Sequence, residues 1–98
     1  MLPFKLSLIK TIDEQFLEVG FSKTEDTEYA VVYQRYDTDY EYTHEICILH
    51  KENGRHLVQS YDPALFDTEN LGCTNVGLTS HELKLIYKKM REKGWLSK

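Results

Sequence analysis

The stretch YDTDYEYTHE, residues 36–45, carries acidic side chains at alternate positions, a spacing that could bind calcium. Asp37, Asp39 and Glu41 would fill positions 1, 3 and 5 of a calcium-binding loop. Such a loop requires glycine at position 6 and a bidentate glutamate at position 12, where this chain has Tyr42 and Ile48. We therefore predict no calcium site and interpret the stretch as an exposed connection between two strands, whose charges oppose edge-to-edge pairing.

Histidines supply the next candidate ligands. His44 and His50 share one face of a predicted strand but lie about 20 Å apart along it, too far to bind one ion. The segment HEICILH also fails the zinc motif HExxH, because its second histidine comes too late. His50 and His56 face each other across a predicted hairpin, but a third ligand is needed and Cys47 points to the opposite face. We predict a pair of surface histidines, with no metal and no cofactor.

Residues for nucleophilic catalysis are present, but not in a recognisable arrangement. The chain has no G-x-S-x-G motif and no glycine-rich phosphate loop. Cys47 alternates with isoleucines and is interpreted as a small core residue, whereas Cys73 lies in the loop segment LGCTNVG without a catalytic partner nearby in sequence. His81 is interpreted as a surface residue. We predict that the protein is not an enzyme, and an enzyme that uses Cys73 or the histidines is kept as a minor alternative.

The tyrosines indicate a contact surface instead. Five of the seven tyrosines lie between Tyr29 and Tyr42, and tyrosine is enriched in protein interfaces. Tyrosine also favours strands, so the alternative is that these are ordinary strand-end residues. The residues that we predict to contribute to a protein contact are Tyr36, Asp37, Asp39, Tyr40 and Tyr42.

Length and composition restrict the class of protein. With 98 residues, 41% of them hydrophobic and 29% charged, the chain is predicted to form a single domain, residues 1–98, around one core. A formal net charge of −4 weighs against direct nucleic-acid binding. The apolar runs are too short to span a bilayer, and the N-terminus does not look like a secretory signal. Cys47 and Cys73 form no C-x-x-C motif or disulfide framework, so we expect a cytoplasmic protein without membrane contacts.

A C-terminal helix is predicted from its end signals. In LTSHELKLIYKKMREKGW, residues 78–95, Thr79 and Glu82 form a capping box and Gly94 is suited to the left-handed cap, followed by Trp95. Apolar residues recur inside the segment at helical spacing. The stripe that we expect this helix to bury consists of Leu83, Ile86, Tyr87 and Met90.

The N-terminal helix repeats this pattern in a shorter form. Thr11 and Glu14 offer a second capping box, and Gly20 and Phe21 take the roles of Gly94 and Trp95. An earlier start of this helix, near Ser7, is an alternative. Each of the two helices is therefore predicted to have a defined beginning and end.

Between the helices the hydrophobic period changes to that of strands. Three segments are rich in β-branched and aromatic residues: residues 28–36, 42–50 and 55–61. Asn53-Gly54 predicts a tight hairpin between the last two. A three-residue loop with Gly54 as the bulge would pair Ile48 with Val58, and we prefer it to a two-residue loop because it matches apolar residues.

The order of elements then predicts the fold. Asp62 and Pro63 in DPALF favour a short helical turn after the third strand. We predict an α+β fold, a three-stranded antiparallel meander with an N-terminal and a C-terminal helix packed on one face, in the order α-β-β-β-α.

Two stretches resemble known proteins. Residues 16–35 (FLEVGFSKTEDTEYAVVYQR) and 78–95 (LTSHELKLIYKKMREKGW) are similar to small uncharacterised proteins encoded by phages and prophages of Gram-positive bacteria. Those proteins often end in a threonine-capped helix, containing Glu-Leu, that Gly-Trp closes. The resemblance covers about 38 of 98 residues and carries no catalytic motif. It implies a bacterial or phage cytoplasmic protein and no particular activity.

The function expected from these observations is protein–protein contact without catalysis. The partner is not identified by the sequence, and a second copy of the chain is one candidate. The alternative is an acidic inhibitor that occupies the nucleic-acid-binding site of a host or phage enzyme. The acids that motivate this alternative are Glu25, Asp26, Glu28, Asp37, Asp39 and Glu41.

Overall fold

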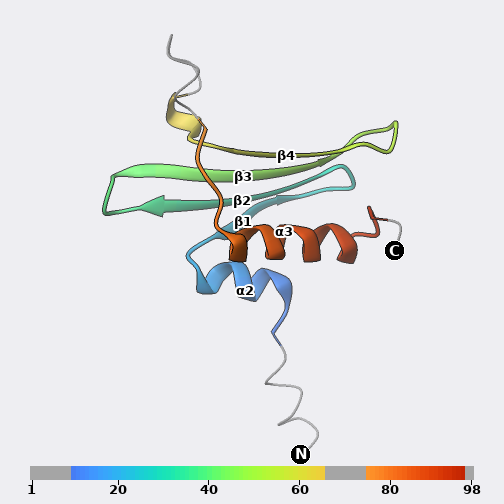
Figure 1. Cartoon of the computed structure of the whole chain (residues 1–98), viewed down its shortest axis with the longest axis horizontal. Coiled ribbons are helices and arrows are strands. Elements are labelled where there is room, and N and C mark those ends of the chain that lie inside the picture. The colour runs from blue at the N-terminus through green and yellow to red at the C-terminus, as the bar shows by residue number, and fades with distance from the viewer. Residues whose placement is uncertain (1–9, 66–74, 97–98) are drawn as a thin grey trace, which may run out of the picture.

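The computed structural model describes residues 10–65 and 75–96, which form an antiparallel sheet with two helices packed on one face (Figure 1). Four strands lie in the sheet in sequence order: β1 (Ser22–Asp26), β2 (Ala30–Asp37), β3 (Tyr42–His50) and β4 (His56–Tyr61). The remaining elements are helix α2 (Ile12–Glu18), the 3-10 turn η1 (Pro63–Leu65) and helix α3 (Ser80–Glu92). The predicted α+β class is confirmed.

The prediction of three strands is wrong, because Ser22–Asp26 forms a fourth strand at the edge of the sheet. All five of its residues are exposed and none is apolar, so the segment SKTED has no alternation to detect. It pairs with β2 from Ser22↔Gln34 to Asp26↔Val31, with a bulge between Lys23 and Glu25. Charges and a bulge are usual on an edge strand, where they discourage further pairing.

The hairpin between β3 and β4 confirms the preferred register. Ile48 pairs with Val58, and His50 pairs with His56. The amide of Gly54 donates to the carbonyl of Lys51 at 2.9 Å, and Gly54 has φ +86°. The bulge position requires this left-handed conformation, which glycine adopts without steric cost. The pair Asn53-Gly54 is therefore a reliable signal for this loop.

The helix ends are also as expected. Thr11 and Thr79 each cap a helix in a reciprocal capping box with Glu14 and Glu82. Past the C-termini, the amide of Phe21 donates to the carbonyl of Phe16, and that of Trp95 to the carbonyl of Met90. The predicted turn at DPALF is η1, and the suggested earlier helix start near Ser7 lies outside the described residues.

The core lies between the helices and one face of the sheet. Phe16 of α2 stacks on Tyr33 with ring centroids 3.8 Å apart, and the buried residues of α3 complete the cluster. The buried strand residues facing the helices are Val31, Tyr33, Ile46 and Ile48. Cys47 alternates with the two isoleucines, so it lies on the opposite face, half-buried, and its interpretation as a core residue is wrong.

Candidate functional site

A polar cluster lies inside the core near the start of α3. His44 of β3 is fully buried, and its Nε2 lies 2.6 Å from Ser60 Oγ on β4. Its Nδ1 lies 3.3 Å from Arg35 Nη2 on β2, and the same Nη2 lies 3.4 Å from Glu82 Oε2 on α3. Serine, histidine and glutamate are the residue types of a hydrolytic triad, so the direction of each hydrogen bond matters.

These hydrogen bonds run in the opposite direction to those of a triad. A guanidinium only donates, so His44 Nδ1 must accept from Arg35, and the neutral ring then carries its proton on Nε2 and donates it to Ser60. A catalytic base would instead accept the serine proton. Burial, assisted by Arg35 and opposed by Glu82, lowers the pKa of His44. The cluster therefore joins three strands to α3 and does not activate Ser60.

Arg35 is held in this cluster by several groups. Its Nη1 donates to the carbonyl of Val19 at 2.9 Å, and its guanidinium carbon lies 4.4 Å from the centre of the Phe21 ring. A Cβ on Gly20 would lie 2.8 Å from Arg35 Cδ, so only glycine fits there. Sequence reasoning missed this cluster. Alternation could have indicated it, because Arg35 follows Val31 and Tyr33 on the face towards the helices.

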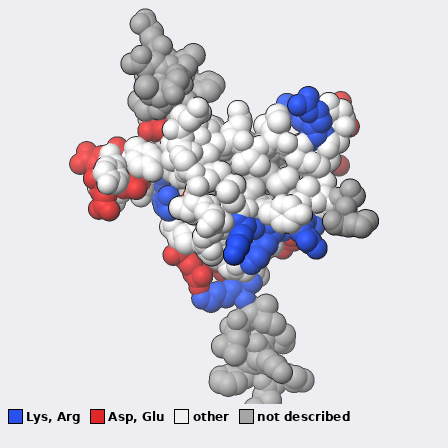
Figure 2. Space-filling model, in the orientation of Figure 1, with Lys and Arg blue, Asp and Glu red and all other residues white. Residues whose placement is uncertain are grey.

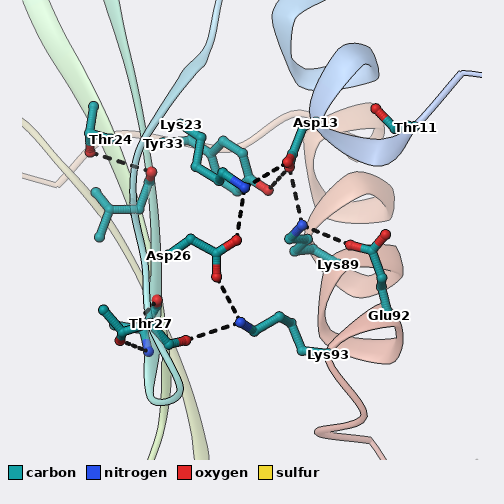
Figure 3. Close-up of polar contacts among 12 residues, drawn as sticks. Thr11, Asp13, Lys23, Thr24, Asp26, Thr27, Tyr33, Lys89, Glu92 and Lys93 are labelled. Atoms are coloured by element: carbon teal, nitrogen blue, oxygen red, sulfur yellow. Dashed lines mark hydrogen bonds and ion pairs between the residues drawn. The ribbon is translucent and has the colours of Figure 1, made fainter.

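A second polar network joins α2, β1 and α3 (Figure 3). Asp13 accepts from Tyr33 Oη at 2.6 Å, from Lys23 Nζ at 2.8 Å and from Lys89 Nζ at 3.2 Å. Burial alone would raise the pKa of Asp13, but these hydrogen bonds outweigh it and lower the pKa to about 2. Lys23 and Lys93 both bind Asp26, at 2.8 and 2.7 Å. The network is charge-compensated and serves to hold the helices on the sheet.

The two facing histidines pack against Trp95. The rings of His50 and His56 are 5.0 Å apart, and Trp95 stacks on His50 at 5.2 Å with the planes only 9° apart. Within residues 10–65 and 75–96, no three His, Cys, Asp or Glu side chains are grouped to hold a metal ion. Cys73 lies outside the described residues.

The predicted contact residues lie at one end of the sheet but point in different directions. Tyr40 is at the tip of the β2–β3 turn and is 80% exposed. Asp37 Oδ1 accepts from the amides of Asp39 and Tyr40, at 2.9 and 3.0 Å. Tyr42 stacks loosely on His44, on the face towards the helices, whereas alternation places the exposed ring of Tyr36 on the opposite face. The structure groups Asp37, Asp39 and Tyr40 and separates the other two tyrosines.

The outer side of α3 forms a second surface, which the sequence did not predict. The expected buried stripe is half wrong: Ile86 and Met90 are buried, but Leu83 and Tyr87 are each 52% exposed. They line a groove of about 770 Å³ together with Ile12 of α2. The charged residues along this groove are Lys84, Lys88, Arg91 and Glu92.

The groove has a cationic rim. Lys84, Lys88 and Arg91 are exposed, and none has an acidic partner within 4.0 Å among the described residues. Glu92 is paired with Lys89 at 2.7 Å. Figure 2 shows basic side chains gathered over α3 and acidic ones at the β2–β3 turn. The groove thus combines an apolar floor with unpaired positive charge.

Comparisons with protein-family models, with curated proteins and with solved structures gave no match. The resemblance to small phage and prophage proteins therefore stays a prediction. None of the described helices is long and apolar enough to cross a membrane.

Proposed function

We propose that this protein acts without catalysis, by protein–protein contact, and that self-association is included in this function. The observation that carries the proposal is the groove on α3, where Leu83 and Tyr87 remain half-exposed beside Ile12. An apolar floor with a charged rim is the usual composition of a contact site. Half of the surface of Leu83 and of Tyr87 is not buried by the core. Burial of this apolar surface by a partner would contribute favourable free energy to binding.

Of the predicted residues Tyr36, Asp37, Asp39, Tyr40 and Tyr42, the three that the structure groups at the β2–β3 turn, Asp37, Asp39 and Tyr40, form the other surface of this proposal. The exposed ring of Tyr40 is held at the tip of a turn whose amides are already bonded, so little order has to be gained on binding. We keep the cytoplasmic location and the phage or prophage origin as part of the same proposal.

The positions of the acids do not favour the alternative of an acidic inhibitor that occupies a nucleic-acid-binding site. Its acids lie in two groups at opposite ends of β2, Glu25–Glu28 and Asp37–Glu41. Glu25 pairs with Val32, so five residues of β2, about 17 Å, separate its position from that of Asp37. Asp26 is also neutralised by Lys23 and Lys93. This distribution does not present one continuous face of phosphate-like charge.

Affinity capture with matched variants tests the proposed function. Parent protein, the double variant Leu83→Ser/Tyr87→Ser and the control Leu17→Ser are used as baits in a lysate of the source cells, and sedimentation velocity measures self-association. Leu17 is 58% exposed but does not line the groove, so it matches the change in surface apolarity. We expect the parent and the control to retain the same protein, which the double variant loses. Equal results with all three baits would exclude the groove.

A further inference from the structure

We propose that the groove on α3 binds the β2–β3 turn, residues Asp37–Glu41, of a second copy of this protein. This inference rests on the proposed function and names the partner of its site. The two surfaces are complementary in charge. The groove offers Lys84, Lys88 and Arg91 around an apolar floor, and the turn offers acids around one exposed aromatic ring.

The side chain that would enter the groove is Tyr40. It is 80% exposed, more than any other large hydrophobic residue among those described. A tyrosine ring brings a large contact area at a low cost in side-chain entropy. Its neighbours Asp39 and Glu41 are exposed and can reach the cations of the rim while the ring contacts Leu83 and Tyr87. Apolar burial would then supply affinity, and charge would supply orientation.

Two amides of the turn are already bonded within it and need no partner in an apolar groove. The amides of Asp39 and Tyr40 donate to Asp37 Oδ1. The lining residues of α3 have their backbone groups bonded within the helix, so they offer no free edge to an extended peptide. Glu41 has φ +54°, a conformation that is uncommon outside glycine and that closes the turn around Tyr40. A preformed tip therefore fits this groove better than an extended segment.

A second copy is a better occupant than a membrane or a nucleic acid. The apolar part of the groove consists only of Leu83, Tyr87 and the partly buried Ile12, and the acid Glu92 lines it too, which is a small and partly acidic face for a bilayer surface. Nucleic acid would be repelled by a chain of formal charge −4 whose acidic turn lies on the same molecule. A second copy instead brings that turn to the cations.

A charge-reversal experiment tests this contact. The groove variant is Lys84→Glu/Lys88→Glu, and the turn variant is Asp39→Lys/Glu41→Lys. In the groove variant both surfaces carry acids, and in the turn variant both carry cations. Sedimentation velocity at low and high salt measures self-association of each variant alone and of an equimolar mixture. We expect each variant alone to self-associate at least about tenfold more weakly than the parent, and the mixture to form a mixed complex. In that mixture each reversed surface meets its opposite charge.

Matched controls separate this contact from a general effect of charge. Lys51→Glu/Arg55→Glu makes the same charge change as the groove variant at exposed cations of the β3–β4 turn, and Glu25→Lys/Glu28→Lys matches the turn variant. Both controls should self-associate as the parent does. Circular dichroism confirms that every variant is folded.

The outcomes are decisive in either direction. A parent that is monomeric at every concentration, a mixture no more associated than its components, or a control that loses association equally would overturn the inference. Binding of the parent to vesicles with 30% phosphatidylglycerol, lost in Leu83→Ser/Tyr87→Ser, would assign the groove to a membrane surface and also overturn it. If the inference fails while capture of another protein persists, the proposed function stands with a different partner.

Discussion

The inner and outer sides of α3 contradict the simple rule that apolar residues are buried and charged residues exposed. On the inner side Glu82 and Lys89 are only 4% and 5% exposed, among Leu85, Ile86 and Met90. On the outer side Leu83 and Tyr87 are both 52% exposed. Hydropathy alone cannot explain this orientation. The orientation of α3 follows the partners that are available to Glu82 and Lys89.

Glu82 and Lys89 can be buried as charged side chains because each has more than one polar partner. Glu82 accepts from the amide of Thr79 at 2.9 Å and lies beside Arg35, whereas Lys89 lies between Asp13 and Glu92. A buried charge without such partners would be strongly destabilising. Burial, which alone would lower the pKa of Lys89, is outweighed by these two carboxylates, which raise it.

Removing Glu82 should have the largest effect on the inner side. We expect Glu82→Ala to lower the free energy of unfolding by about 2–3 kcal/mol, because it removes half of a capping box and leaves the partly buried Arg35 without its carboxylate. Urea unfolding at pH 7 measures this change. Glu82→Gln keeps a side chain that can accept from Thr79 and removes only the charge. A stability of Glu82→Ala within 0.5 kcal/mol of the parent, a margin of about the size seen for surface substitutions, would show that the inner side does not depend on Glu82.

Removing the charge of Asp13 tests the partner of Lys89. We expect Asp13→Asn to cost about 1.5 kcal/mol at pH 7, a value reduced for the partial exposure of Asp13. A carboxyl whose pKa is lowered stabilises the fold above its unfolded pKa, so this advantage is lost as the pH falls from the ordinary value of 3.8 to about 2. Urea midpoints of parent and variant should converge over this range. Curves that stay parallel would contradict the role of the ionised Asp13.

His44 gives the inner side a second dependence on pH. Its pKa is lowered, so between that value and about 6.5 the unfolded chain binds more protons than the folded protein, and stability falls as the pH falls. The loss between pH 7.5 and 5.5 is at most about 1.4 kcal/mol. We expect His44→Gln to flatten this part of the stability curve, measured by urea midpoints. An unchanged slope would show that His44 does not carry this dependence.

The outer side should respond least in stability. We expect Leu83→Ser and Tyr87→Ser each to change the free energy of unfolding by no more than about 0.5 kcal/mol, as surface substitutions usually do. Thermal unfolding measures this change, and Leu85→Ser on the inner side is the contrasting variant. A large loss in Leu83→Ser would mean that this side chain contributes to the core and would remove the basis for a binding groove.

Local signals predicted those parts of the fold that depend on a few neighbouring residues. The capping boxes at Thr11 and Thr79 and the Gly54 bulge each involve contacts within a few positions along the chain, so the sequence contains the whole interaction. The strand predicted at residues 42–50 has the same bounds as β3. Strand β1 could not be found this way, because pairing with β2 creates it and its side chains have no apolar pattern.

The candidate site was harder to predict for the same reason. Apolar residues at positions 83, 85, 86, 87 and 90 cover so wide an arc of α3 that more than one face could be the buried one. The choice depends on whether Glu82 and Lys89 find partners, and those partners are Arg35 on β2 and Asp13 on α2. The acidic composition of the segment around Tyr40 was enough to predict that its residues are exposed. The groove that they are proposed to fill required the orientation of α3.

The ion pair between Lys89 and Asp13 also bears on how fast the domain folds. These residues are 76 positions apart, whereas β2, β3 and β4 pair with their neighbours along the chain through short turns. Closing a long loop is entropically slower than closing a hairpin. We therefore expect the meander to form early and α3 to dock on α2 late, after the main barrier. In that case Lys89 and Asp13 scarcely affect the rate of folding, and they lengthen the lifetime of the folded protein by slowing its unfolding.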